Sequence, residues 1–252
     1  MLDLLKGVRV LEFGILLNGD HLGMLLSDLG ADVLRLWVAA EDSSEDIRLS
    51  LEILNRLADA YRRIRNTSRF LLGTLADFDP ERDRCPYGDM DELDHWALLR
   101  LGGLIARVRR AYEDYQFHVA FHAIHNFCAV DLSSLYLDII KDRLYVSAPD
   151  DSRRRASQTV CFEVLTALTR LMAPVLSFTA QEAWEELAGD GSSVFEQTWY
   201  EFRLPRDAAQ LRERWLKLRG LRSDVLKQLE TLRVGGSIGS SLAGEVELSA
   251  NG

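Results

Sequence analysis

The sequence predicts a mainly α fold, a bundle of about six helices over residues 32–234. From about residue 50 onward, apolar residues recur at spacings of three, four and seven, as on one face of an amphipathic helix. These segments do not alternate as a half-buried strand would, and proline, glycine or aspartate-serine breaks separate them. Because several amphipathic helices can bury their apolar faces only against one another, we expect a bundle.

Four apolar stripes locate the expected helices in chain order, each with polar residues on the opposite face. The members are Leu54, Leu57, Tyr61, Ile64 and Leu71 in the first; Leu93, Ala97, Leu101, Leu104, Val108 and Tyr115 in the second; Cys161, Leu165, Leu168 and Met172 in the third; and Leu211, Trp215, Leu218, Val225, Leu229 and Leu232 in the fourth.

The expected helices have clear boundaries. Pro80 ends the first, since proline cannot continue a helix. Asp151 or Ser152 is a plausible N-cap for the third stripe. Residues 189–193 read as a loop, and the glycines at 235–236 break the last helix. The segment 31–40 fits either a strand or a helix.

The two ends of the chain differ from the bundle. Residues 8–14 form a compact apolar run closed by glycine, and residues 21–30 read as a short helix, so residues 1–31 are expected to be a βα fragment. Residues 235–252 are expected to be a linker and the start of a truncated C-terminal region, with alternation at 245–250 typical of a short strand.

Composition limits the classes of function. In 252 residues with 47% apolar content there is no uncharged apolar run of membrane-spanning length, and the N-terminus does not read as a signal peptide. Cys85, Cys128 and Cys161 are far apart, which favours a reducing, cytoplasmic setting, with Cys128 and Cys161 as core residues. The net charge of −9 argues against a protein that attracts nucleic acid through its overall electrostatic field, but it is compatible with a local basic surface.

The best binding candidate is the basic helix at 57–72. Arg62, Arg65 and Arg69 lie three and four residues apart and therefore share one face, beside Asn66. Such a row of guanidinium groups can pair with phosphates and position a nucleic acid. The competing interpretation is an exposed helix surface with intrahelical partners.

The segment 136–145 combines charge with aromatic residues. Lys141 and Arg143 could contact an RNA backbone, or they could join the neighbouring aspartates in a salt-bridge network between helices. Tyr136 and Tyr145 could stack on bases, but core packing is the expectation for both.

His118, His122 and His125 fall on one helical face with spacing that metal sites use. However, Val119 stands where the glutamate of a HExxH zinc-protease motif would be. We expect half-buried histidines and no metal site.

Three stretches resemble a known family: LADAYRRIRNTSRFLLGTLADFDP (57–80), FCAVDLSSLYLDIIKDRLYVSAP (127–149) and MAPVLSFTAQEAWEEL (172–187). They resemble the helical anticodon-binding domain of the isoleucyl-tRNA synthetases, which are class I aminoacyl-tRNA synthetases. The resemblance covers residues from about 30 to 250 and implies binding of isoleucine-type tRNA in the cytoplasm, with Arg62, Arg65, Asn66, Arg69, Lys141 and Arg143 as candidate contacts.

The same resemblance implies no catalytic residue and no cofactor in this chain. The family's ATP- and Mg-dependent chemistry needs a His-Ile-Gly-His-like element and a Lys-Met-Ser-Lys-Ser-like loop. The one near-match, His21-Leu22-Gly23-Met24, lacks the final histidine. We therefore expect the chain to be inactive as a ligase on its own.

Residues 4–33 resemble the opening of the family III CoA-transferases, but their catalytic aspartate would lie beyond this segment. The sequence thus leaves three hypotheses: a tRNA anticodon-arm binding module, an inert helical remnant or chimera, and a CoA-transferase fragment. It says nothing about oligomeric state.

Overall fold

The computed structural model describes residues 30–41, 50–201, 208–240 and 243–248. Contacts between residues divide the chain into two compact units, Met1–Arg203 and Leu204–Gly252. No strand occurs in the described ranges. The βα fragment expected for residues 1–31 lies, apart from its last two residues, outside the described residues.

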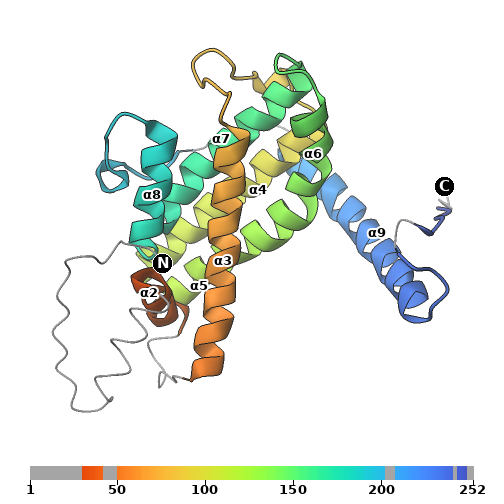
Figure 1. Cartoon of the computed structure of the whole chain (residues 1–252), viewed down its shortest axis with the longest axis horizontal. Helices are drawn as coiled ribbons and strands as arrows, with labels where there is room; N and C mark the ends of the chain where they lie inside the picture. Colours follow the sequence, from red (N-terminus) through yellow and green to blue (C-terminus); the bar gives the residue numbers. More distant parts are fainter. Residues whose placement is uncertain (1–29, 42–49, 202–207, 241–242, 249–252) are drawn as a thin grey trace. The chain divides into compact units, whose positions relative to one another are not determined.

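Every regular element in the described residues of the first unit is a helix (Figure 1). Long helices alternate with short connections, as expected of a bundle. The elements are α2 (Ala31–Ala40), α3 (Leu51–Thr74), η2 (Tyr87–Asp89), α4 (Glu92–Glu113), α5 (Phe117–Asn126), η3 (Phe127–Tyr136), α6 (Leu137–Val146), α7 (Ser152–Met172), α8 (Ser177–Ala188) and η4 (Val194–Glu196).

Helix α7 forms the centre of this unit and packs against α3, α4, α6 and α8. The side chains from Ala156 to Cys161 are all buried, and so are those from Val164 to Thr169. The stripe of Cys161, Leu165, Leu168 and Met172 is therefore confirmed, although it underestimates how completely the helix is enclosed. At its start, Asp151 is the N-cap and accepts a hydrogen bond from the Arg154 amide at 2.9 Å.

The ambiguous segment 31–40 is the helix α2, and its polar residues tie it to α8. The carboxylate of Asp32 is buried and accepts hydrogen bonds from the backbone amides of Phe178 at 3.3 Å and Thr179 at 2.7 Å. Helix α8 has no side-chain cap of its own, so Asp32 caps it from another helix. Arg35 donates to the carbonyls of Val175 at 2.8 Å and Pro174 at 2.9 Å.

Between α5 and α6 the chain continues as a π-helix, η3 (Phe127–Tyr136). A π-helix has a wider turn than an α-helix and is often found at functional sites. In this one Cys128, Leu132 and Tyr136 are buried. η3 packs against α3 and α4.

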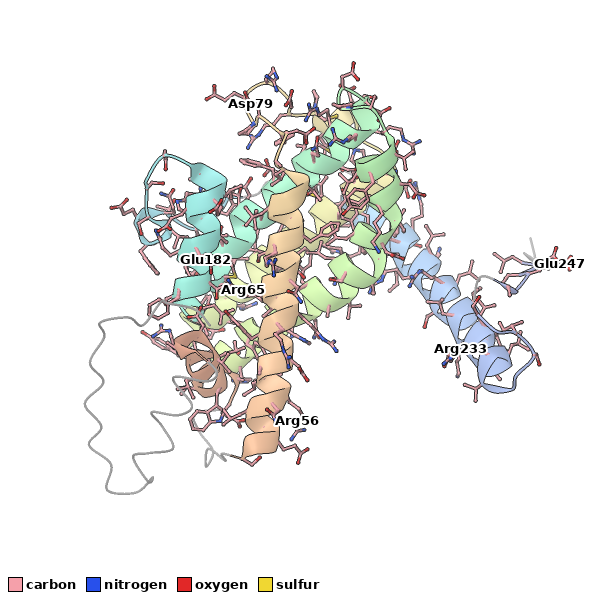
Figure 2. All side chains as sticks on the ribbon, in the orientation of Figure 1. Arg56, Arg65, Asp79, Glu182, Arg233 and Glu247 are labelled. Atoms are coloured by element: carbon pink, nitrogen blue, oxygen red, sulfur yellow. The ribbon has the colours of Figure 1, made fainter. Side chains whose placement is uncertain are left out.

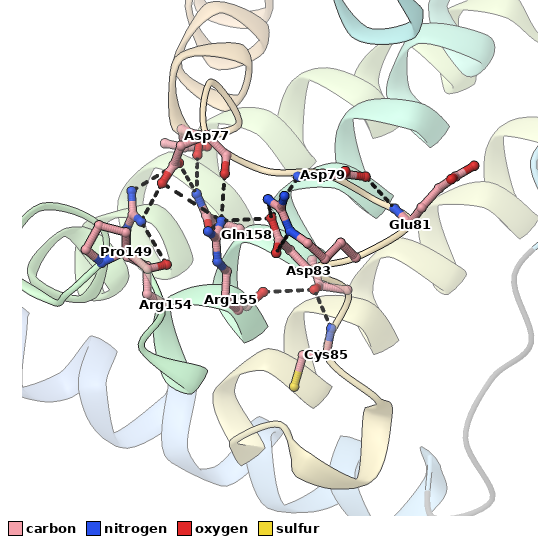
Figure 3. Close-up of polar contacts among 12 residues, drawn as sticks. Asp77, Asp79, Glu81, Asp83, Cys85, Pro149, Arg154, Arg155 and Gln158 are labelled. Atoms are coloured by element: carbon pink, nitrogen blue, oxygen red, sulfur yellow. Dashed lines mark hydrogen bonds and ion pairs between the residues drawn. The ribbon is translucent and has the colours of Figure 1, made fainter.

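The loop after α3 is fastened to the start of α7 (Figure 3). Arg154 makes two hydrogen bonds to the Asp77 carboxylate, at 2.6 and 3.1 Å, and Gln158 donates to the same carboxylate at 2.7 Å. Arg155 lies 3.4 Å from Asp83. Cations at a helix N-terminus oppose the helix dipole, so these aspartates offset an unfavourable charge arrangement.

Two details of the second stripe and of segment 136–145 differ from expectation. α4 ends at Glu113, and Tyr115 follows it in a turn with a φ of 56° and a side chain that is 78% exposed. Asp114 and Tyr115 belong to the turn rather than to a continuing apolar stripe. Tyr145 is 68% exposed and so is no core residue, whereas Tyr136 is fully buried, as expected.

The second unit contains α9 (Ala208–Val234), which ends where the glycines at 235–236 predict. Leu211 is buried, while Trp215, Val225 and Leu229 are half-buried. The strand expected at 245–250 is wrong for residues 245–248, which belong to neither a helix nor a strand; residues 249–250 are outside the described ranges. In the described parts of the chain, no helix combines the length and apolar character needed to cross a membrane.

Candidate nucleic-acid interface

Helix α3 carries a solvent-exposed basic surface. Between Asp59 and Asp77 the sequence has no acidic residue, but it has four arginines. Arg62, Arg63, Asn66 and Arg69 are exposed, because the buried side chains of α3 (Leu54, Ile64 and Leu71 among them) face the bundle. Arg62 pairs with Asp59 on its own helix. Arg63 and Arg69 have no carboxylate within ion-pair distance among the described residues.

Arg65 differs from its neighbours because it joins two helices (Figure 2). Its guanidinium makes two hydrogen bonds to the Glu182 carboxylate on α8, at 2.6 and 2.7 Å. The side chain is 22% exposed, and its pKa is raised chiefly by the hydrogen bonds to Glu182. A bidentate arginine–carboxylate pair fixes the geometry of both partners. Arg65 thus holds α8 against α3, while Arg62 and Arg69 remain at the surface.

A groove of about 430 Å³ runs between α3, η3 and α6. Arg63, Asn66 and Lys141 supply its polar rim, and all three are exposed. Half-buried Phe70 and buried Leu137 supply apolar surface. The remaining lining residues are Thr67, Ala129 and Ser133. The groove brings together two of the residues predicted from the sequence, Asn66 and Lys141, which lie 75 positions apart.

Lys141 and Arg143 have different surroundings, although both were candidates for RNA contact. Lys141 is exposed and pairs with Asp138 on the same helix at 2.9 Å. Arg143 is 15% exposed and pairs with Asp94 at 3.0 Å and with Asp91 at 2.8 Å. The alternative of a salt-bridge network between helices therefore describes Arg143.

Asp94 is the buried centre of that network. It is fully enclosed and accepts hydrogen bonds from Tyr136 Oη at 2.6 Å and Arg143 Nη1 at 3.0 Å. Burial raises the pKa of Asp94, while Tyr136 and Arg143 act in the opposite direction. This cluster links α4, η3 and α6, and Ser157 of α7 joins it 3.4 Å from Arg143 Nη1. Buried charges of this kind are stable only when they are paired.

Histidines and cysteines do not form a second site. His118 and His125 are half-buried and His122 is exposed. The pKa of His125 is lowered by burial and then by the nearby charge of Arg63. Burial raises the pKa of Cys128 and of Cys161 to about 12, as suits core thiols. In the ranges that the structure covers, no cluster of histidine, cysteine or acidic side chains could hold a metal ion.

Sequence reasoning missed Arg63, Phe70 and Ser133 in the groove. Arg63, Asn66 and Phe70 have helical spacings of three and four, so they share a face of α3, and this spacing was a signal available in the sequence. Ser133 could not be placed from the sequence, because η3 does not have the α-helical period from which faces are assigned.

The comparisons with known proteins agree with this architecture. A family profile described as the anticodon-binding domain of tRNA ligase matches residues 94–248. An isoleucine–tRNA ligase of Syntrophotalea carbinolica is 52% identical over 227 residues, which are 90% of this chain and 24% of the relative. An isoleucine–tRNA ligase of Carboxydothermus hydrogenoformans is 49% identical over 90% of this chain and 25% of the relative.

A solved structure gives the same fold at lower identity. The crystal structure of a ternary complex of LeuRS, tRNA and LeuAMS from Agrobacterium radiobacter aligns with a TM-score of 0.51 and 17% identity, over 74% of this chain and 21% of that one. These matches do not support the resemblance of residues 4–33 to CoA-transferases.

The chain spans about a quarter of the length of the curated relatives that it matches. The profile match covers more than half of the chain, and the relatives are isoleucine–tRNA ligases. This chain belongs to the family of anticodon-binding domains of tRNA ligases, in its isoleucine–tRNA ligase branch.

Proposed function

We propose that this chain binds the anticodon arm of an isoleucine-type tRNA through the exposed basic surface of α3. The observation that carries the proposal is the row of Arg62, Arg63, Asn66 and Arg69, which faces solvent in a domain of the anticodon-binding family. Exposed guanidinium groups pair with phosphates and fix the position of a nucleic acid without reading its bases.

The charge of the rest of the chain shapes the expected affinity. The chain carries a net charge of −9, so it repels a polyanion except where arginines concentrate. We expect weak binding with steep salt dependence, because displaced counterions drive phosphate contacts.

Two triple variants test the proposal. The first changes Arg62, Arg63 and Arg69 to glutamine, and leaves Arg65 intact because it holds α8. The second, a matched control, changes Arg107, Arg109 and Arg110 on α4 to glutamine and removes the same charge. Binding of isoleucine tRNA and of an unrelated tRNA is measured by filter retention over a salt series.

The α3 variant should bind both tRNAs more weakly than wild type, with a salt slope that is smaller by about one unit for each arginine–phosphate pair removed. The control variant should keep a slope close to that of wild type. Equal binding by wild type and both variants would exclude α3 as the binding surface. Absence of tRNA binding by the wild-type chain would favour an inert helical bundle.

A further inference from the structure

The groove between α3, η3 and α6 has the size and chemistry of a site for one small ligand. Its volume of about 430 Å³ lies within the range of about 300–1,000 Å³ typical of such sites. It is too small to enclose a helix or strand of a partner protein. Two cations, one amide and one aromatic side chain are among the residues that line it.

The rim favours an anion. Arg63 has no carboxylate partner in the described parts of the chain, and there the only ion pair of Lys141 is with exposed Asp138. Exposed ion pairs within one helix contribute little to stability, so a phosphate can replace Asp138 at little cost. The half-buried His125 next to Arg63 adds little charge near neutral pH, because its pKa is lowered by burial and by Arg63.

The remaining lining favours a planar polar ring. Phe70 and Leu137 offer apolar surface against which the face of a nucleobase can lie. The Asn66 amide offers one acceptor and two donors, and no hydrogen-bond partner within the described residues occupies it. An asparagine amide pairs in a bidentate manner with adenine, through N6 and N7.

We propose that this groove binds a single unstacked adenine nucleotide of the bound RNA, with its phosphate at Arg63 and Lys141 and its base between Phe70 and Asn66. This inference rests on the proposed function and adds a base-reading site to it. The phosphate contacts supply affinity for any sequence, and the Asn66 amide supplies the preference for adenine.

The test uses the full chain and four fluorescein-labelled pentaribonucleotides, UUXUU, in which X is A, G, C or U. Binding is followed by fluorescence anisotropy at low salt. Asn66→Ala is compared with Asn55→Ala, a matched control at an exposed asparagine of the same helix outside the groove. Arg63→Gln and Lys141→Gln are compared with Arg56→Gln, which lies about three turns before Asn66 on α3.

We expect wild type to bind the adenine pentamer at least about fivefold more tightly than the other three, the lower end of what a bidentate base contact gives. Asn66→Ala should abolish this preference, so that the variant binds the adenine pentamer no more tightly than UUUUU. Arg63→Gln and Lys141→Gln should weaken all four pentamers by a similar factor. Asn55→Ala and Arg56→Gln should behave as wild type.

Failure of this inference is distinguishable from failure of the proposed function. If tRNA still binds with the α3-dependent salt slope but the pentamers show no adenine preference, or do not bind, the adenine site is excluded and the proposed function stands. The adenine site is likewise excluded, and the proposed function stands, if Asn66→Ala still prefers the adenine pentamer. Equal competition by an acidic peptide and by the adenine pentamer would indicate a site for carboxylates and would likewise overturn the inference.

Discussion

At the scale of single residues, the arginines of this domain have two distinct roles that depend on exposure. Arg143 and Arg65 are largely enclosed and hold helices together through Asp94 and Glu182. Arg63 and Arg69 face solvent without a carboxylate partner in the described residues. A substitution in the first group is expected to change stability, and one in the second to change binding.

Arg143→Met tests the structural role. The change leaves the Asp94 carboxylate buried without its cation, which costs about 3–5 kcal/mol when a buried pair is broken. Urea unfolding at pH 7 should show this loss, and the second substitution Asp94→Asn should restore much of it. If Arg143→Met unfolds at the same urea concentration as wild type, the pair has no structural role.

The pH dependence of the Arg143→Met variant has a definite sign. Burial raises the pKa of Asp94, and removing Arg143 removes a charge that lowers it. A carboxyl group whose pKa is higher in the folded than in the unfolded state favours folding more strongly as the pH falls. The deficit of the variant, measured by urea unfolding, should therefore shrink between pH 7 and pH 5.

Arg65→Gln and Arg62→Gln form a matched pair on one helix. Arg65 joins α3 to α8, and because Glu182 is 43% exposed we expect a cost of about 1 kcal/mol. Arg62 pairs with Asp59 of its own helix, and both side chains are more than 60% exposed, so its replacement should cost less than about 0.5 kcal/mol. Equal midpoints of thermal unfolding for the two variants would contradict the assignment of Arg65 to the α3–α8 contact.

At the scale of elements, the loop after α3 is held by hydrogen bonds and ion pairs in addition to an aromatic contact with α7. The Asp77 carboxylate accepts hydrogen bonds from Arg154 and Gln158, and the amide of Cys85 donates to Thr159 Oγ1 at 2.9 Å. This loop contains the acidic part of the DFDP segment, and Arg154 and Arg155 are its partners, whereas Arg153 pairs with Asp91. That basic cluster is thus neutralised within the fold.

Asp77→Asn should release this loop. The variant loses the ion pair with Arg154, so amide hydrogen exchange at Cys85 should accelerate while the core of α7 stays protected. Glu81→Gln, an exposed carboxylate of the same loop, is the control. Unchanged exchange in Asp77→Asn would show that packing holds the loop without the aspartate.

Wild type should show the same release in acid. The Arg154 hydrogen bonds lower the pKa of Asp77, so its contribution is complete above the ordinary aspartate pKa near 3.9 and is lost as the pH falls below about 4. Hydrogen exchange at Cys85, compared between pH 5 and pH 3 after correction for intrinsic rates, measures this loss.

How far the sequence predicts the elements depends on their environment. Helix periodicity placed α3, α4, α7 and α9, since one face of each had to be apolar. It left 31–40 undecided, because distant contacts hold α2: it packs on α3 and α5, and Asp32 and Arg35 bond to α8 and the turn before it, more than 130 residues away. The groove could not be predicted for the same reason: Asn66 and Lys141 meet only through the packing of α3 against η3.

At the scale of the whole molecule, the bundle is expected to be independent of the first residues of the chain. The contacts of α2 with α8 begin at Asp32, and the apolar residues of α3, α4 and α7 pack with one another. A chain that starts at residue 29 should therefore unfold cooperatively in calorimetry. Asp32→Ala in the full-length chain is the contrasting variant and should lose about 0.5–2 kcal/mol, because α8 loses its cap.

Loss of cooperative unfolding in the shortened chain would show that residues 1–28 contribute to the core. A shortened chain more stable than Asp32→Ala would show that Asp32 contributes more to the anchoring of α2 than residues 1–28 do. The comparison therefore separates the role of α2 from that of the segment before it.

The π-helical stretch η3 has a consequence for how relatives of this chain can vary in length. The number of residues in η3 sets the orientation of α6 about its axis, so losing one residue from Phe127–Tyr136 while keeping the π-helical turn would rotate all of α6. The same rotation would move Lys141 out of the groove and Arg143 away from Asp94. Insertions and deletions should therefore be tolerated in the surface loop at 189–193 and be absent from η3, however freely individual side chains there are exchanged.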